Sequence, residues 1–156
     1  MRFSEKLLKF TRITSGLLLI FLLSVPALVG GFALISVPDG STLQMKTELL
    51  RHSPFSDFFI PGVVLFSVNG ILAMIAGVLC ISGKWIYPRL TVFMGFFVVM
   101  WISIQLFFIH EFIIFQPLYL ALGAVLIVLG LLMDRMKNKV SAAGKREIQS
   151  APRPVS

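Results

Sequence analysis

The sequence predicts an all-α integral membrane protein, a four-helix bundle with both termini on the cytoplasmic side. Two properties of the composition indicate a membrane protein: 57% of the 156 residues are hydrophobic and only 13% are charged. Soluble domains average about 25% charged residues, because they must solvate their whole surface. The third observation is segregation. Charged side chains gather in short segments between long uncharged runs, as in a protein whose outer surface faces lipid.

Four apolar runs are long enough to cross a bilayer, which takes roughly 17–25 residues. They cover residues 13–36, 60–82, 90–109 and 112–133, and none of them contains a charged side chain. The first run is longer than the core of a signal peptide, and no small-residue cleavage site follows it. We therefore expect all four to be retained as spanning helices.

Lysine and arginine residues set the predicted orientation. Twelve of the 14 lie in segments 1–12, 83–89 and 134–156, and the other two lie in segment 37–59. Cytoplasmic segments of membrane proteins carry an excess of these residues, so segments 1–12 and 134–156 are both predicted to be cytoplasmic. The net charge of +7 does not indicate nucleic acid as a partner, because the basic residues flank apolar segments.

The C-terminal segment 134–156 loses the apolar residues of the preceding run and is predicted to be a short disordered extension. Its basic side chains are expected to lie against anionic lipid. A docking site for a protein partner is the alternative.

The connection 37–59 is predicted to be extracytoplasmic. Pro38, Asp39 and Gly40 form a turn signal. The spacing of Leu43 and Leu50 then suggests a short interfacial helix lying on the membrane. Farther along, Ser56 or Asp57 is expected to cap the helix of residues 60–82 and to favour its dipole.

The segment from Ser53 to Gly62 carries a more specific pattern, PF-x-D-[aromatic]-x-IPG. It resembles a segment of a functionally uncharacterised family of small bacterial four-span membrane proteins. The resemblance extends over about residues 13–133 and implies a four-helix bundle in the bacterial cytoplasmic (inner) membrane. It does not point to any particular activity. The candidate motif residues in this outer loop are Pro54, Phe55, Asp57, Pro61 and Gly62.

Five polar or aromatic residues inside the spans are predicted to converge in the outer half of the bundle, because helix phase and depth place them at similar levels. They are Asn69, Trp101, Gln105, Gln116 and Tyr119. One interpretation is structural: the side chains hydrogen-bond one another and fix helix register. The other is an outward-facing site for a small ligand.

The residues that carry chemistry in enzymes do not form a recognisable motif here. The two histidines lie on predicted loops and Cys80 is the single cysteine, so no metal site, no cofactor and no catalytic group is expected. Charged residues, which mark ion-coupled pathways, do not occur in the spans. The sequence thus predicts a non-enzymatic polytopic protein of the lipid bilayer that binds lipids or other membrane proteins. A small transporter or permease-like protein acting as a homo-oligomer is the alternative.

Overall fold

The computed structural model describes residues 2–51, 53–108 and 115–150, and in these ranges it contains helices and connections but no strand. Four of its helical rods are long and apolar enough to cross a membrane. This confirms the predicted all-α, four-span fold. The elements of the rods, in chain order, are α1 (Arg2–Leu17), η1 (Leu18–Ser24), α2 (Val25–Ser36), α3 (Phe59–Val64), η4 (Leu65–Leu72), α4 (Ala73–Ser82), α5 (Tyr87–Phe108) and α6 (Phe115–Ser150).

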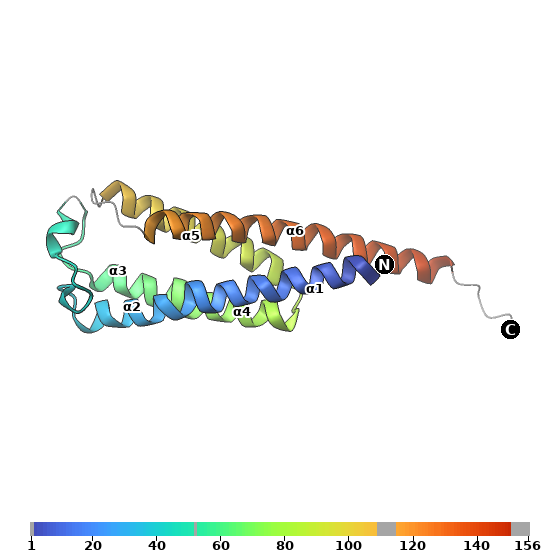
Figure 1. Cartoon of the computed structure of the whole chain (residues 1–156), viewed down its shortest axis with the longest axis horizontal. Helices are drawn as coiled ribbons and strands as arrows, with labels where there is room; N and C mark the ends of the chain where they lie inside the picture. The colour runs from blue at the N-terminus through green and yellow to red at the C-terminus, as the bar shows by residue number, and fades with distance from the viewer. Residues whose placement is uncertain (1, 52, 109–114, 151–156) are drawn as a thin grey trace.

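The rods form two antiparallel hairpins (Figure 1). In the first hairpin, α1, η1 and α2 make one continuous rod that packs against the rod of α3, η4 and α4. In the second, α5 packs along α6. The first rod starts, and α6 ends, at one end of the bundle, which we call the terminal end; the loop end is the opposite one, which holds residues 37–58.

The hairpins meet near the terminal end and diverge toward the loop end (Figure 1). Between hairpins, the main contacts join α1 to α6 and α4 to α5. A shared core, which includes Leu19, Ala76, Met94 and Leu126, joins the two hairpins in the middle of the bundle. The halves of the two hairpins nearer the loop end are therefore less tightly joined to each other.

Glycine residues allow the closest helix contacts. A Cβ atom added to Gly95 on α5 would lie 2.7 Å from the carbonyl oxygen of Gly123 on α6, which is closer than such atoms can approach. Gly16 and Gly77 form an equivalent pair between α1 and α4. In lipid, helices associate through close packing of this kind, since no hydrophobic force drives them together.

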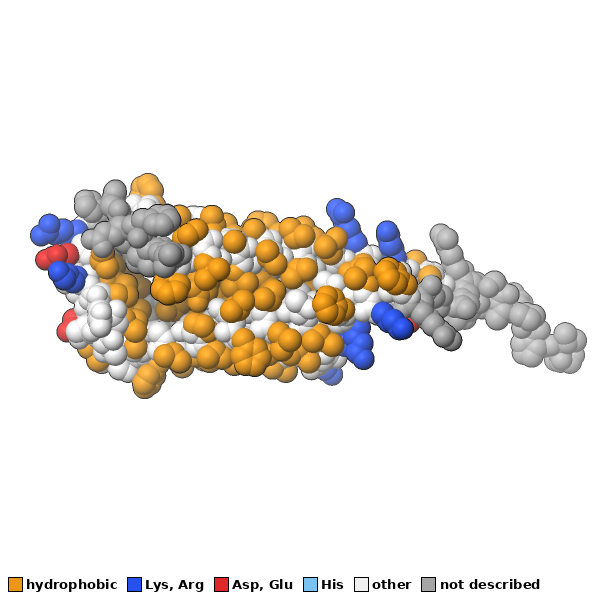
Figure 2. Space-filling view, viewed as in Figure 1, with side chains coloured by type: hydrophobic (Ala, Val, Ile, Leu, Met, Phe, Trp, Pro, Cys, Tyr) orange, Lys and Arg blue, Asp and Glu red, His pale blue; other side chains and the backbone are white. Residues whose placement is uncertain are grey.

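The outer surface of the rods is a wide apolar belt with basic side chains beside it at the terminal end (Figure 2). Large side chains such as Phe21, Phe32 and Phe96 are exposed on it. The belt is what a surface in contact with hydrocarbon requires.

The prediction of a disordered tail at 134–156 is wrong for residues 134–150, because α6 continues to Ser150. No proline interrupts this stretch and most of its residues are good helix formers. Contacts also hold its first turn: the Lys137 Nζ donates to the carbonyl oxygen of Trp85 at 2.6 Å, and the Asn138 Nδ2 donates to Asp134 at 3.5 Å. Residues 151–156 lie outside the described ranges.

The predicted bounds of the spans shift slightly. Segment 1–12 belongs to α1 from Arg2 onward, the second span begins at Phe59, and the third begins at Tyr87. The predicted end of the third span at 109 and start of the fourth at 112 lie outside the described residues.

Candidate functional site

Two short π-helices, whose turns are wider than those of an α-helix, lie side by side within the first hairpin. They are η1 on one rod and η4 on the other. Pro26 explains the first, because it has no N–H to donate to the preceding turn. The Val25 N–H instead bonds to the carbonyl of Ile20, five residues back. The buried Ser24 hydroxyl then donates to the Gly70 carbonyl in η4 at 2.8 Å and ties the two turns together. Such turns recur at functional sites, since they change which side chains face inward.

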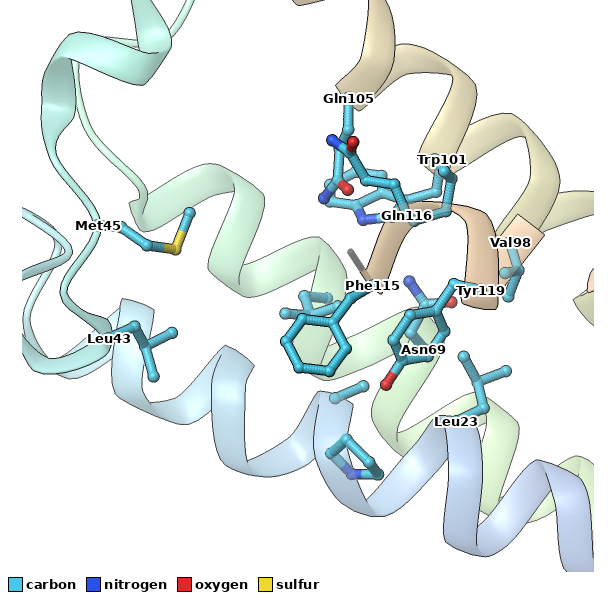
Figure 3. A pocket seen from close by; sticks show the side chains of 14 residues that line it. Leu23, Leu43, Met45, Asn69, Val98, Trp101, Gln105, Phe115, Gln116 and Tyr119 are labelled. Atoms are coloured by element: carbon cyan, nitrogen blue, oxygen red, sulfur yellow. The ribbon is translucent and has the colours of Figure 1, made fainter. Parts of the chain in front are cut away.

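A cavity of about 440 Å³ lies beside these turns, between the diverging hairpins. Figure 3 shows Leu43 and Met45 at its loop end and Leu23 and Val98 at the opposite end. All five polar or aromatic residues predicted to converge line it together. The complete lining is Leu23, Pro26, Ala27, Leu43, Met45, Leu65, Asn69, Val98, Trp101, Ile102, Gln105, Phe115, Gln116 and Tyr119.

The five residues come from three different elements. Asn69 comes from η4 in the first hairpin and is only 2% exposed. Trp101 and Gln105 lie one turn apart on α5, and Gln116 and Tyr119 lie in the first turns of α6. Figure 3 shows Trp101, Gln105 and Gln116 gathered on one side of the cavity, with Asn69 and Tyr119 farther from the loop.

Two polar atoms in this wall are buried without a hydrogen bond. They are the Oδ1 of Asn69 and the indole Nε1 of Trp101, for which the described part of the chain supplies no partner. The interpretation that these residues fix helix register through mutual hydrogen bonds does not hold for these two atoms. A buried polar atom without a partner is costly, so each is a place where a bound molecule would be stabilised.

The position of the Trp101 ring is fixed from within its own helix. Its ring stacks on that of Phe97, with centroids 6.4 Å apart and planes inclined by 11°.

The electrostatic character of the cavity is neutral. No Asp, Glu, Lys, Arg or His occurs among its lining residues within the described ranges. The polar groups are three carboxamides, an indole and a phenol, which form hydrogen bonds without carrying charge. No group of three residues able to hold a metal ion occurs in the part of the chain that the structure describes.

The loop between α2 and α3 covers the loop end of the cavity with Leu43 and Met45. The expected single interfacial helix is absent from the described loop; two 3₁₀ turns, η2 (Ser41–Leu43) and η3 (Thr47–Leu50), take its place. The break falls at Gln44, which has a positive φ of 55°. Before it, the Asp39 carboxylate accepts the Ser41 N–H at 2.8 Å, and this bond lowers the pKa of Asp39.

The PF-x-D-[aromatic]-x-IPG segment folds onto the first hairpin. Phe58 is buried with Leu34 and Leu50, and its N–H donates to the Pro38 carbonyl at 2.8 Å. The Asp57 carboxylate accepts the N–H of Phe59, the first residue of α3, at 2.9 Å. The N-cap position of α3 is Phe58, so Asp57 lies one residue before the position predicted for a cap.

The other motif residues differ in their surroundings. Gly62 is buried against Leu34, where a Cβ atom would lie 2.8 Å from that side chain. Phe55 and Pro61 line a smaller cavity of about 90 Å³, which shares Trp101 with the larger one. Pro54 is exposed. The segment thus borders the smaller cavity, not the larger one.

Sequence reasoning missed the apolar wall. Leu23, Pro26 and Ala27 of the first rod face the cavity, as do Leu43 and Met45 of the loop. Only Pro26 carries a signal that could have pointed to them, since proline inside a span marks a local change of helix geometry.

Comparison of the chain with protein-family models, curated proteins and solved structures gave no match. The similarity of residues 53–62 to the four-span family therefore stays a prediction.

Proposed function

We propose that this chain is a non-enzymatic membrane protein that binds a lipid-like, mostly apolar molecule between its two hairpins. The observation that carries the proposal is the cavity of about 440 Å³ between them, lined mainly by apolar side chains with a few neutral polar groups. Ligand pockets are typically about 300–1,000 Å³ in volume and have this composition. A cavity between apolar helices is also reached most easily by molecules that dissolve in the bilayer.

Orientation and location are part of the proposal. The positive-inside rule and the basic residues beside the terminal end favour that end as the cytoplasmic one. The cavity would then open in the outer half of a bacterial cytoplasmic membrane.

The described lining contains no Asp, Glu, Lys, Arg, His or Cys, which favours binding over catalysis. General acid–base chemistry needs a side chain that exchanges protons near neutral pH, and carboxamides, indoles and phenols are poorly suited to this. The protein would therefore hold or present its ligand unchanged.

A tryptophan quenching experiment tests the proposal. The chain has two tryptophans, and Trp85 lies outside the cavity, 69% exposed. In a Trp85→Phe background Trp101 reports on the cavity alone. A monoacylglycerol with a brominated acyl chain should quench it with saturation in lipid nanodiscs, and the unlabelled monoacylglycerol should compete.

A pair of variants separates binding in the cavity from contact with surrounding lipid. Ala27→Phe fills the cavity from a residue that is 5% exposed, whereas Val29→Phe changes the lipid-facing side of the same helix at 66% exposure. Saturable quenching should disappear only in Ala27→Phe. Linear quenching that both variants share would refute the proposal.

The divergence of the hairpins at one end alone favours a second candidate, a transporter that opens to each side in turn. Cys80 distinguishes the two, because it is the single cysteine and is fully buried near the terminal end. A transporter loaded with the monoacylglycerol should expose Cys80 to an impermeant maleimide applied at the terminal end. A binding protein should leave it unreactive.

A further inference from the structure

We infer that the preferred ligand is an uncharged alcohol or primary amide with a hydrocarbon body, and that its polar group lies between Asn69 of the first hairpin and Trp101 of the second. This inference rests on the proposed function and specifies its ligand. It uses the Oδ1 of Asn69 and the Nε1 of Trp101, which are buried in the cavity wall and have no hydrogen-bond partner among the described residues.

Asn69 supplies the first requirement. Its side chain lines the cavity at 2% exposure, and its Oδ1 accepts no hydrogen bond from the described residues. The π turn η4 turns this residue toward the cavity, whereas its neighbour Ser67 faces outward and bonds to its own helix at the Val63 carbonyl. A ligand that donates a hydrogen bond would satisfy the carboxamide oxygen.

Trp101 supplies the second requirement from the opposite hairpin. The indole Nε1 is a donor only, and it too is buried without a partner in the described ranges. A ligand that accepts a hydrogen bond would satisfy it. Hydroxyl and primary amide groups both donate and accept, so one head group can meet both requirements.

The lack of charged side chains in the described lining restricts the class of ligand to uncharged molecules. A carboxylate or ammonium group entering the cavity would lose its hydration, and no lining residue that the structure describes carries an opposite charge. Burying an unpaired charge in this way is far more costly than burying a neutral polar group. The wall therefore selects against fatty acids and amines of the same chain length.

The remaining lining suits the hydrocarbon body. Leu23, Pro26, Leu65 and Val98 surround the larger cavity. Leu65 also borders the smaller cavity of about 90 Å³, so apolar space continues toward the outer loop.

A series of probes with the same alkyl chain tests the inference: 1-decanol, decanamide, decyl methyl ether, decanoate and decylammonium. Binding is followed by Trp101 emission in the Trp85→Phe background, with each affinity normalised to the mole fraction of the probe in the nanodisc. Decanol and decanamide should bind at least about fivefold more tightly than the ether, which accepts but cannot donate, because a neutral hydrogen bond is worth about 1 kcal/mol. Decanoate and decylammonium should bind more weakly than the ether.

Variants assign the preference to the two residues. Asn69→Leu should reduce decanol binding to the level of the ether and leave ether binding unchanged, whereas Ser67→Leu on the lipid-facing side should keep the preference. Trp101→Phe keeps an aromatic ring and removes the hydrogen-bond donor. The apparent affinity for decanol, measured from the decanol dependence of the unfolding temperature, should then fall about fivefold. This second readout keeps the test decisive if Asn69→Leu does not fold.

The outcomes separate the two proposals. Equal affinity for all five head groups, or a preference for a charged one, would overturn the inference while leaving a lipid-binding cavity. Saturable binding by none of the probes, together with the absence of quenching by the brominated monoacylglycerol, would overturn the proposed function itself.

Discussion

The terminal end and the loop end of the bundle contain similar residues but are packed in different ways. At the terminal end Cys80, Tyr87 and Met133 form a buried cluster across both hairpins. The Cys80 thiol donates to the Arg12 carbonyl at 3.2 Å. At the loop end the same two hairpins enclose a cavity, and the Asn69 Oδ1 and Trp101 Nε1 in its wall have no hydrogen-bond partner in the described part of the chain. One end is therefore joined by a buried cluster across both hairpins, whereas the other end contains a cavity between them.

The largest effect on stability is expected when a methionine is replaced by alanine at the terminal end, and the same replacement at the loop end is the comparison. Met133→Ala removes a fully buried side chain from the terminal cluster, and should lower the free energy of unfolding by about 2–5 kcal/mol. Met45→Ala acts at the half-exposed rim of the cavity and should cost under about 1 kcal/mol, since water or lipid already reaches that site. Equilibrium unfolding in mixed micelles measures both. Equal losses would mean that the two ends are packed alike.

The glycine contact within the second hairpin gives the next largest expected effect. Gly95→Ala places a Cβ atom 2.7 Å from the Gly123 carbonyl oxygen, and should destabilise the protein by about 1–3 kcal/mol through forced separation of α5 and α6. Gly30→Ala is the matched control, because its Cβ would meet only a Leu65 methyl at 3.7 Å. Thermal unfolding should distinguish them. A stable Gly95→Ala protein would show that the helices can move apart freely.

A smaller effect of opposite sign is expected at the cavity. Asn69→Leu removes a buried carboxamide whose oxygen has no partner in the described ranges, so the stability of the empty protein should stay unchanged or rise by about 1 kcal/mol. Ser67→Leu, on the outward side of η4, should have little effect. The same unfolding assay applies. A large loss of stability in Asn69→Leu would assign this residue to the structural framework.

The smallest predicted effect concerns the hydrogen bond between the two wide turns. Ser24→Ala removes the hydroxyl that donates to the Gly70 carbonyl, and should cost about 0.6 kcal/mol, the average for such bonds in membranes. The control is Ser103→Ala, because that exposed hydroxyl bonds only within its own helix, to the Val99 carbonyl. The difference between the two variants isolates the contact between helices. No difference would mean that packing alone aligns the turns.

The predictable part of the site follows from helix geometry. Asn69, Trp101 and Gln105 could be assigned to one level of the bundle because each residue adds a fixed rise and rotation along a helix. Two predictions failed: the single helix expected in the loop, and the end of the last helix expected near Met133. Nothing in the local pattern distinguished two 3₁₀ turns at 41–50 from one short helix, and the charged stretch after Met133 continues as helix because its propensity and its contact with Trp85 favour it.

The sequence by itself determined the four spans, their apolar outer surface and the unequal distribution of basic residues. These are local properties, since the transfer of a side chain into lipid depends mainly on that side chain and its depth. Only the tertiary structure decided that the hairpins diverge at the loop end and that Pro26 and Ala27 form a wall of the cavity. It also decided that Asn69 and Trp101 line this cavity and that each has a buried polar atom with no partner among the described residues. Such features depend on how distant segments pack against each other, which no single segment encodes.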